Sequence, residues 1–236
     1  MTKLLSLFFT ALAVSVGAAD KSYHPQIVPA EFQAAVDNPF YPFAPGTTWK
    51  YLEKSGGATS TNTITVMHET KVIMGVTCVV VHETVARNRR IAEDDYKWLA
   101  QHRDGAVWCF GTAARETSPG GRISTEGSWE AGIKGAQPGI LMPGRPQPGK
   151  PYRQEYLYNV AENMAQIVAT NETVTVPAGT FSGCVKTREW SMMEAGTELK
   201  WYARGVGVVK EVATSGDQVV LMSISQESPP GPIITP

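Results

Sequence analysis

The sequence lacks an excess of charge of either sign. Charged residues make up only 18% of the 236 residues, and 21 Lys and Arg stand against 22 Asp and Glu, which gives a formal net charge of -1. A chain without surplus positive charge has little with which to neutralise phosphates, so nucleic acid is not an expected partner. Long runs of Ala, Glu, Lys and Leu are also missing, while 22 Gly and 16 Pro indicate many turns and short strands.

Recognisable catalytic and redox motifs are missing as well. The sequence has no Gly-Ser nucleophile elbow and no P-loop, so a triad hydrolase and a phosphate cradle have no support. The pairs His68-Glu69 and His82-Glu83 are not H-E-x-x-H motifs, and neighbours in a strand point to opposite faces. The three cysteines form no C-x-x-C pair, which argues against a cysteine zinc site or a thioredoxin-type redox centre.

A long apolar run is present at the start of the chain. Lys3 precedes apolar residues from Leu4 to Val16, and small residues follow before Asp20, which is the layout of a cleavable secretory signal over residues 1–19. The run of about 14 apolar residues is shorter than the roughly 20 needed to span a bilayer. We therefore expect an exported protein, periplasmic or extracellular, without a membrane span. Export to an oxidising compartment permits one disulfide among the three cysteines.

From Thr47 onward the pattern has a period of two residues and is rich in Val, Thr, Ile, Tyr and Trp. It predicts an all-β fold, a single antiparallel meander forming a barrel or strongly curved sheet with an internal cavity. The predicted strands are 47–54, 61–73, 76–87, 91–103, 106–112, 122–128, 152–158, 165–176, 181–192, 198–203, 206–212 and 217–226.

Three further segments frame this barrel domain of residues 47–227. Residues 20–46 form a Pro- and aromatic-rich lead, expected to pack across the barrel end or outer wall with at most one short helix near Pro29–Val36. Residues 130–150 carry Gly or Pro at nearly every other position and are predicted to be a long loop or lid over the cavity. Residues 228–236 are predicted to be a flexible tail.

Tight turns at Met74-Gly75 and Asn88-Arg89 predict a strand register. The first turn pairs Ile73 with Val76, and the second makes Glu83 the cross-strand neighbour of Asp94. The predicted inward face carries Val66, His68, Val72, Val79, Val81, Glu83, Val85, Asp94, Tyr96, Trp98, Ala100, His102, Val107 and Cys109. The predicted outward face carries Glu69, Lys71, His82, Glu93, Asp95, Lys97 and Gln101, and by the same alternation Cys184 points outward while Glu189 points inward. With Cys78 and Cys184 both outward and Cys109 inward, we expect the disulfide to join Cys78 to Cys184.

Polar residues on this otherwise apolar inner face form the predicted site. Burying an ionised carboxylate without a partner is costly, so His68, Glu83 and Asp94 are expected to pair with one another, with a cation or with a wet cavity. They are candidate acid/base groups and, because imidazole and carboxylate suit zinc or calcium, candidate ligands of a divalent metal. The alternative is a satisfied polar network without catalytic function. Candidate ligand-binding residues are Tyr96, Trp98, His102, Trp129 and Glu189.

Several stretches carry a family resemblance. They include NPFYPFAPGTTWKY (38–51), EDDYKWLAQHRDGAVWCFG (93–111), TVTVPAGTFSGCVKT (173–187) and YARGVGVVKE (202–211). With its V-P-x-G-T-F and Y-A-x-G-V-G-x-V-K signatures, the chain resembles secreted bacterial proteins of unassigned activity, and it is similar to periplasmic proteins of the lipoprotein-carrier type. The resemblance implies a curved antiparallel sheet with an internal cavity and an acid at the positions of Glu83 and Asp94. It differs at Asp95 and Lys97, where the family more often has Thr and Asp.

These observations give three hypotheses of function. The first is that the protein binds or carries a small ligand in a partly polar barrel cavity. The second is a secreted lyase or hydrolase that acts on a small or saccharide-like substrate with the interior His/Glu/Asp cluster. The third is a structural envelope protein.

Overall fold

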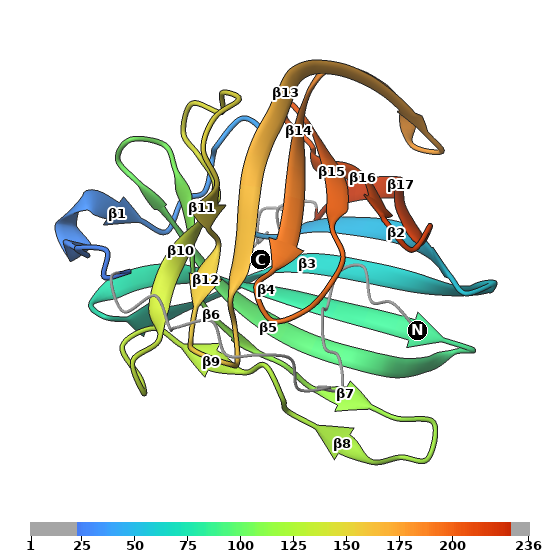
Figure 1. Ribbon diagram of the computed structural model, residues 1–236, viewed down its shortest axis with the longest axis horizontal. Coiled ribbons are helices and arrows are strands. Elements are labelled where there is room, and N and C mark those ends of the chain that lie inside the picture. Colours follow the sequence, from blue (N-terminus) through green and yellow to red (C-terminus); the bar gives the residue numbers. More distant parts are fainter. Residues whose placement is uncertain (1–22, 228–236) are drawn as a thin grey trace, which may run out of the picture.

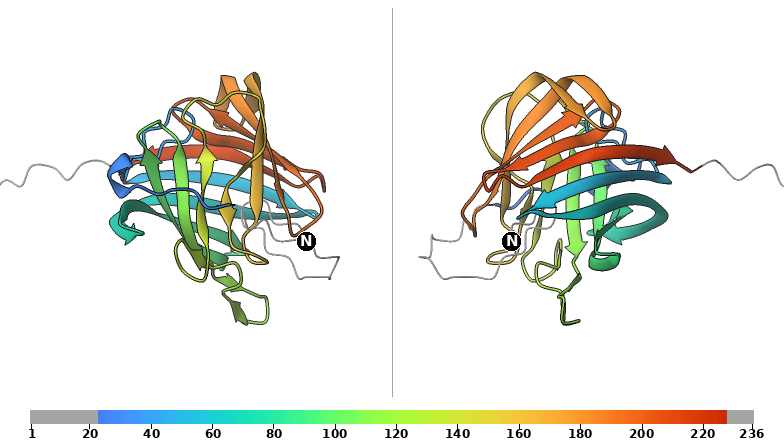
Figure 2. Two further views of the ribbon diagram at one scale, coloured as in Figure 1. Left: turned by 60° about the vertical axis from the view of Figure 1, so that its left-hand side comes forward. Right: turned by 90° about the vertical axis from the view of Figure 1, so that its right-hand side faces the viewer.

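The computed structural model describes residues 23–227, and they form an antiparallel sheet of 17 strands that curves into a nearly closed barrel (Figures 1 and 2). The prediction of an all-β fold is confirmed. The predicted signal peptide and the predicted tail lie outside the described residues. The strands are β1 Phe32–Gln33, β2 Thr47–Ser55, β3 Ala58–Ile73, β4 Val76–Arg87, β5 Arg90–His102, β6 Val107–Ala113, β7 Glu116–Thr117, β8 Ile123–Ser124, β9 Trp129–Glu130, β10 Gln137–Met142, β11 Tyr152–Arg153, β12 Glu155–Tyr156, β13 Asn163–Val176, β14 Gly179–Ser191, β15 Glu198–Ala203, β16 Gly207–Ala213 and β17 Gln218–Gln226.

Two meanders build the barrel wall. Strands β2 to β6 pair in sequence order, as do β13 to β17. The two meanders join where β17 pairs with β2 and, on the other side, where β6 pairs with β10, which in turn pairs with β12. The short strand β11 pairs with β13, so hydrogen bonding continues around the sheet.

The lead segment contains one short helical turn. A 3₁₀ turn, η1, spans only Pro29–Glu31, and β1 follows it and pairs with β5. Val36 and Phe43 form a bridge and are buried in the core. Tyr41 and Phe43 also line the internal cavity, so the lead forms part of the cavity wall.

The prediction that residues 130–150 form a continuous loop is wrong at the centre of the segment. This segment contains β10, which lies in the wall between β6 and β12, and its Ala136 and Met142 are fully buried. Gly139 is needed for this placement, since a Cβ built there would lie 2.4 Å from the backbone carbon of Gln154. Gly139 therefore permits close packing of strands, while Gly132 and Gly135 lie in turns with positive φ.

The turn at Met74-Gly75 is confirmed, but the strands after it do not keep the predicted register. Ile73 lies opposite Val76 as predicted, and both turn residues have positive φ. A bulge then places three residues, 67–69, between the pairs Val66–Val81 and Thr70–Val79. His68 lies in this bulge, and its side chain is 71% exposed. The prediction that His68 points inward is therefore wrong.

The second turn leads to a similar correction. Asn88 and Arg89 both have positive φ and form the predicted two-residue turn, with Arg87 opposite Arg90. A shift between the pairs Ala86–Ile91 and Val85–Glu93 then inserts one extra residue into β5. One extra residue reverses the faces of a strand, because side chains alternate. Glu83 therefore lies opposite Asp95 instead of Asp94.

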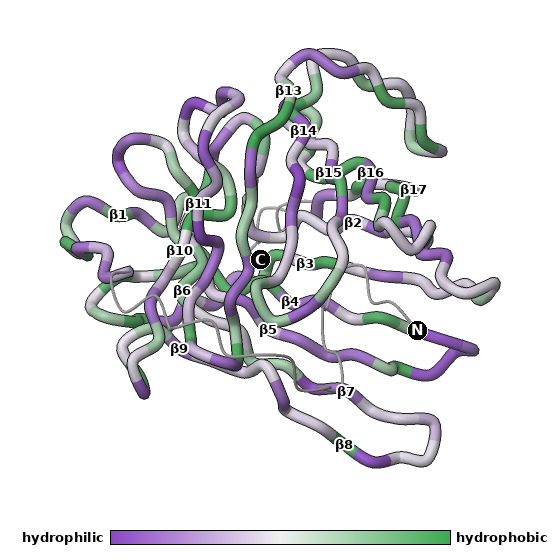
Figure 3. The backbone as a smooth tube through the Cα atoms, in the orientation of Figure 1, coloured by the Kyte–Doolittle hydropathy of each residue, from purple (hydrophilic) through white to green (hydrophobic). Residues whose placement is uncertain are grey.

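As a consequence, the inner face of β5 is more polar than predicted. Glu93, Asp95 and Gln101 are buried, while Asp94 is partly exposed and Tyr96 is exposed, the reverse of the predicted arrangement. Hydrophilic stretches accordingly occur within the strands as well as at the turns (Figure 3).

The predicted disulfide does not form. Cys78, Cys109 and Cys184 are all free and all buried, so the outward placement of Cys78 and Cys184 is also wrong. Each thiol has a backbone acceptor of its own, the carbonyl oxygens of Val76, Gly111 and Phe181 respectively. Burial raises the pKa of both Cys78 and Cys109 to about 12, which keeps these thiols protonated.

Across residues 23–227, no helix is both long enough and apolar enough to cross a membrane.

Candidate functional site

The barrel encloses a cavity of about 800 Å³. This volume lies in the range of about 300–1,000 Å³ that is typical of small-molecule sites. Its wall is built by both meanders and the lead segment, and it combines aromatic rings with charged groups. The aromatic residues of the wall are Tyr41, Phe43, Trp49, Tyr51, Trp190 and Tyr202.

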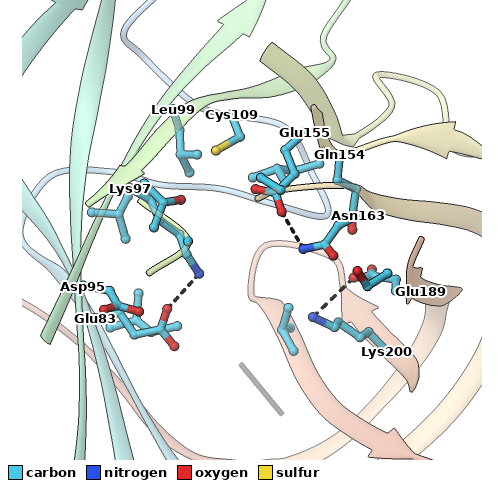
Figure 4. A pocket seen from close by; sticks show the side chains of 18 of the residues that line it. Glu83, Asp95, Lys97, Leu99, Cys109, Gln154, Glu155, Asn163, Glu189 and Lys200 are labelled. Atoms are coloured by element: carbon cyan, nitrogen blue, oxygen red, sulfur yellow. Dashed lines mark hydrogen bonds and ion pairs between the residues drawn. The ribbon is translucent and has the colours of Figure 1, made fainter. Parts of the chain in front are cut away.

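The first charged group, the Lys97 cluster, consists of Glu83, Asp95 and Lys97. Asp95 and Lys97 are two residues apart on β5 and therefore share its inner face, with Glu83 of β4 opposite Asp95. The Lys97 Nζ lies 2.8 Å from Glu83 Oε2, and Asn62 donates to Glu83 Oε1 at 2.7 Å. The ion pair between Lys97 and Glu83 is drawn as a dashed line in Figure 4. Burial acts to lower the pKa of Lys97, but the Glu83 carboxylate outweighs it and the pKa is raised. Lys97 therefore carries a full positive charge inside the barrel.

The second charged group, the Lys200 cluster, has three acids around one lysine. The Lys200 Nζ lies 2.9 Å from Glu198 Oε1, 3.2 Å from Glu189 Oε2 and 3.7 Å from Glu211 Oε2. Glu189 also accepts hydrogen bonds from Tyr202 and from Thr187, each at 2.8 Å.

The other two acids of the Lys200 cluster are less well satisfied. Glu211 is 0% exposed, and neither of its carboxyl oxygens has a hydrogen-bond partner among the described residues. Burial raises the pKa of Glu211 well above its ordinary value and also raises that of Glu198, with Lys200 opposing both shifts. The Lys200 ammonium thus does not offset the effect of burial on Glu198 and Glu211.

The third group is Glu155 on β12. Trp129 Nε1 donates to Glu155 Oε2 at 2.9 Å, and Asn163 Nδ2 donates to Oε1 at 2.6 Å. Burial raises the pKa of Glu155 to about 7, although the Trp129 hydrogen bond and Lys97 act in the opposite direction. Figure 4 shows Glu155 and Lys97 pointing toward the same space from different parts of the wall. Near neutral pH this carboxyl group can both give and accept a proton.

Three of the residues predicted from the sequence belong to this site. Glu83 and Glu189 line the cavity as predicted. Trp129 is buried and holds Glu155 through its indole N–H, so it supports the cavity wall from behind.

The other predicted site residues lie elsewhere. His68 pairs with Glu227 at 3.1 Å on the surface, and Asp94 pairs with His82 at 2.7 Å, with 35% of its side chain exposed. The predicted cluster of His68, Glu83 and Asp94 is therefore not assembled. Residues 23–227 also hold no group of three or more His, Cys, Asp or Glu residues arranged to bind a metal ion.

The remaining aromatic and histidine candidates are on the outer side of the sheet or at its edge. Tyr96 stacks on His82 with ring centroids 4.4 Å apart, and the Lys71 ammonium lies 3.5 Å above the Trp98 ring. His102 contacts Glu31 at 3.1 Å, next to the lead segment.

Sequence reasoning missed Glu155 and Glu211, and it missed both lysines of the site. A signal for the Lys200 cluster is present: Glu198, Lys200 and Tyr202 are spaced two residues apart, so they share one face of β15. A strand with charges on one face and apolar residues on the other is normally read as charges toward water. In β15 the charged face points into the cavity, so the usual rule would assign Glu198 and Lys200 to the solvent side incorrectly.

Comparisons with known proteins give a family match over part of the chain and two solved structures of low similarity. Residues 161–224 match the DUF3108-like family, which covers most of β13 to β17. No curated protein matches the chain.

Two solved structures are similar at low identity. One is from Bacteroides fragilis and is provisionally described as an exported protein with a YmcC-like fold; it shares 16% identity at a TM-score of 0.47, over 79% of this chain and 99% of that chain. The other is from Parabacteroides distasonis and is provisionally described as a lipoprotein; it shares 14% identity at a TM-score of 0.42, over 79% of this chain and 98% of that chain. The likeness to lipoprotein carriers stays a prediction from the sequence.

Proposed function

We propose that this protein binds or carries a small polar molecule inside the barrel. The observation that carries the proposal is the cavity of about 800 Å³ inside the barrel with the Lys97 cluster, the Lys200 cluster and Glu155 on its wall. Buried charged groups are expensive to maintain, and they are found where they bind something or act chemically. The secretory signal predicted for residues 1–19 supports placing this function outside the cytoplasm.

Among the residues predicted from the sequence, Glu83 and Glu189 are proposed to contact the ligand. Both carboxylates are already held by a lysine and by neutral donors. Such fixed, partly satisfied groups orient a polar ligand without having to rearrange. Trp129 is proposed to act indirectly, by positioning Glu155.

The test is to fill the cavity. Leu141 lines it, so Leu141→Trp should reduce its volume, whereas Leu199→Trp enlarges a half-buried residue of β15 that does not line it. The proteins are exposed to a small-molecule extract of the producing cells and examined by native mass spectrometry. The wild type should carry an adduct, and Leu141→Trp should carry much less of it. The control should keep the adduct. The proposal would be contradicted if the wild type carried no adduct, or if Leu141→Trp carried as much adduct as Leu199→Trp.

A second candidate function is catalysis, and the position of Glu155 favours it. A carboxyl group with a pKa of about 7 that faces an enclosed cavity suits a general acid or base in a lyase or hydrolase reaction. Replacing Glu155 by Gln should then leave ligand binding measurable while turnover falls by about two orders of magnitude or more. A variant that turns the bound molecule over at the wild-type rate would exclude this role for Glu155.

A further inference from the structure

The charges that line the cavity are strongly unbalanced. Among the described residues of its wall there are nine carboxyl side chains and two lysines, with no arginine or histidine. The whole chain has a formal net charge of only -1, so the imbalance belongs to the cavity and not to the protein as a whole. The carboxyl residues are Glu83, Asp95, Glu126, Glu155, Glu162, Glu189, Glu194, Glu198 and Glu211.

The two lysines are already occupied. Lys97 is bonded to Glu83, and Lys200 has its shortest contacts with Glu198 and Glu189. Glu211 is fully buried and is the most distant of the three acids around Lys200, at 3.7 Å, without a hydrogen bond to either of its oxygens. This carboxyl group lines the cavity, and both of its oxygens can accept a hydrogen bond from a donor that residues 23–227 do not supply.

Glu155 offers a second position of the same kind. Both of its oxygens are held by uncharged donors, the Trp129 indole and the Asn163 amide. These hydrogen bonds orient the carboxyl group but bring no positive charge to it. A buried carboxyl group in this situation takes up a proton or a cation.

The approach to the cavity is acidic too. Glu126, Glu162 and Glu194 lie in the connections that follow β8, β12 and β14, and Glu126 is exposed while the other two are half-buried. Carboxyl groups of one sign around a low-dielectric cavity raise the local concentration of ions of the opposite sign. The aromatic rings of Tyr41 and Tyr202 add π-faces, which also attract cations.

We propose that the ligand is a small organic cation with one or more amino or guanidinium groups, held by Glu211 and Glu155. This inference rests on the proposed binding function and adds the chemical class of the ligand. The raised pKa values of Glu211 and Glu155 support it, because the cation then replaces protons that these groups hold in the empty cavity. Binding should therefore release protons near neutral pH.

The experiment is isothermal titration calorimetry with three probes of matched length: 1,4-diaminobutane, 1,4-butanediol and succinate. The diamine should bind at least about tenfold more tightly than the diol, and succinate should not bind, because a dianion meets like charges. Titrations in buffers of different ionisation enthalpy should show proton release with the diamine. Glu211→Gln and Glu155→Gln should each weaken diamine binding by about tenfold. The control, Glu69→Gln, changes an exposed acid of β3 that does not line the cavity and should bind as the wild type does.

The outcomes separate this inference from the proposed function. Equal or tighter binding of the diol or of succinate, or no binding of any probe, would overturn the inference about a cation. An adduct that is uncharged or anionic and is lost in Leu141→Trp would overturn it as well, yet leave the binding function standing. Diamine binding that is unchanged in Leu141→Trp would place the cation outside the cavity and count against both. Because Glu211 and Glu155 lie on different strands, one variant still tests the inference if the other does not fold.

Discussion

Glu155 should make the stability of the barrel fall as the pH rises. Burial raises its pKa from 4.5 to about 7, so the folded protein holds this proton more tightly than the unfolded chain does. The stabilising contribution is fully present below about pH 4.5 and is lost as the pH rises through about 7. A difference of this size corresponds to about 3 kcal/mol of unfolding free energy.

The perturbation that isolates this effect is Glu155→Gln. A glutamine has no proton to lose, and its carbonyl oxygen can still accept the hydrogen bond from Trp129, while the Asn163 amide can turn its oxygen toward the new N–H₂ group. The variant should therefore gain stability relative to the wild type between about pH 5 and about pH 8.5, by about 3 kcal/mol over the interval. Glu198 and Glu211 also titrate, but they do so in both proteins and cancel in the difference.

Urea unfolding followed by tryptophan fluorescence gives the two stability curves. The matched control is Glu69→Gln, which makes the same substitution at an exposed acid of β3 outside the cavity. A difference between Glu155→Gln and wild type that stays constant within about 0.5 kcal/mol across the interval would refute the argument. It would mean that Glu155 is as well solvated in the barrel as in the unfolded chain.

Three further predictions concern the wall and its interior. The three buried thiols should be unreactive toward a thiol reagent in the native protein and fully reactive in denaturant. An intact protein mass two hydrogens below that of the fully reduced chain would show a disulfide instead. Gly139→Ala should destabilise the fold by about 2–4 kcal/mol in urea unfolding, because β10 approaches β12 closely there, whereas Gly149→Ala, with its nearest contact at 3.6 Å, should cost about 0.5 kcal/mol or less. Lys97→Met should lower the free energy of unfolding by about 3–5 kcal/mol at neutral pH, because it leaves Glu83 buried without its cation. Adding Glu83→Gln should recover part of this free energy. Equal stabilities of the single and double variants would contradict the pairing.

The strands were predictable from the sequence because alternation and turn chemistry are local signals. Asn88-Arg89 and Met74-Gly75 were both identified as turns, and both have the positive φ values that two-residue hairpin turns require. The bulges that follow these turns were not predictable in the same way. A bulge adds residues without any change of composition, and a single extra residue, as in β5, reverses the faces of every residue beyond it until the next irregularity.

The sequence around Asp94 shows why the error could not be noticed locally. Glu93, Asp94 and Asp95 are three consecutive acids, so hydrophobic alternation offers no choice between the two registers at this point. The inward direction of Lys97 was missed for a related reason. Charged side chains are assigned to the solvent side by default, and only an enclosed polar cavity, which is a property of the whole barrel, makes the inner side acceptable to them.

The pairing of β17 with β2 places the two sides of the barrel seam at opposite ends of the described chain, with Gln226 opposite Thr47. Contacts this distant in sequence are costly in loop entropy and slow to form, so closure is expected to come late in folding. Synthesis must proceed past Gln226 before the whole seam can be made. A chain truncated before Gln218 would expose the edges of both β16 and β2. Unpaired edges recruit other strands, and premature termination should therefore yield aggregates in place of a smaller soluble barrel.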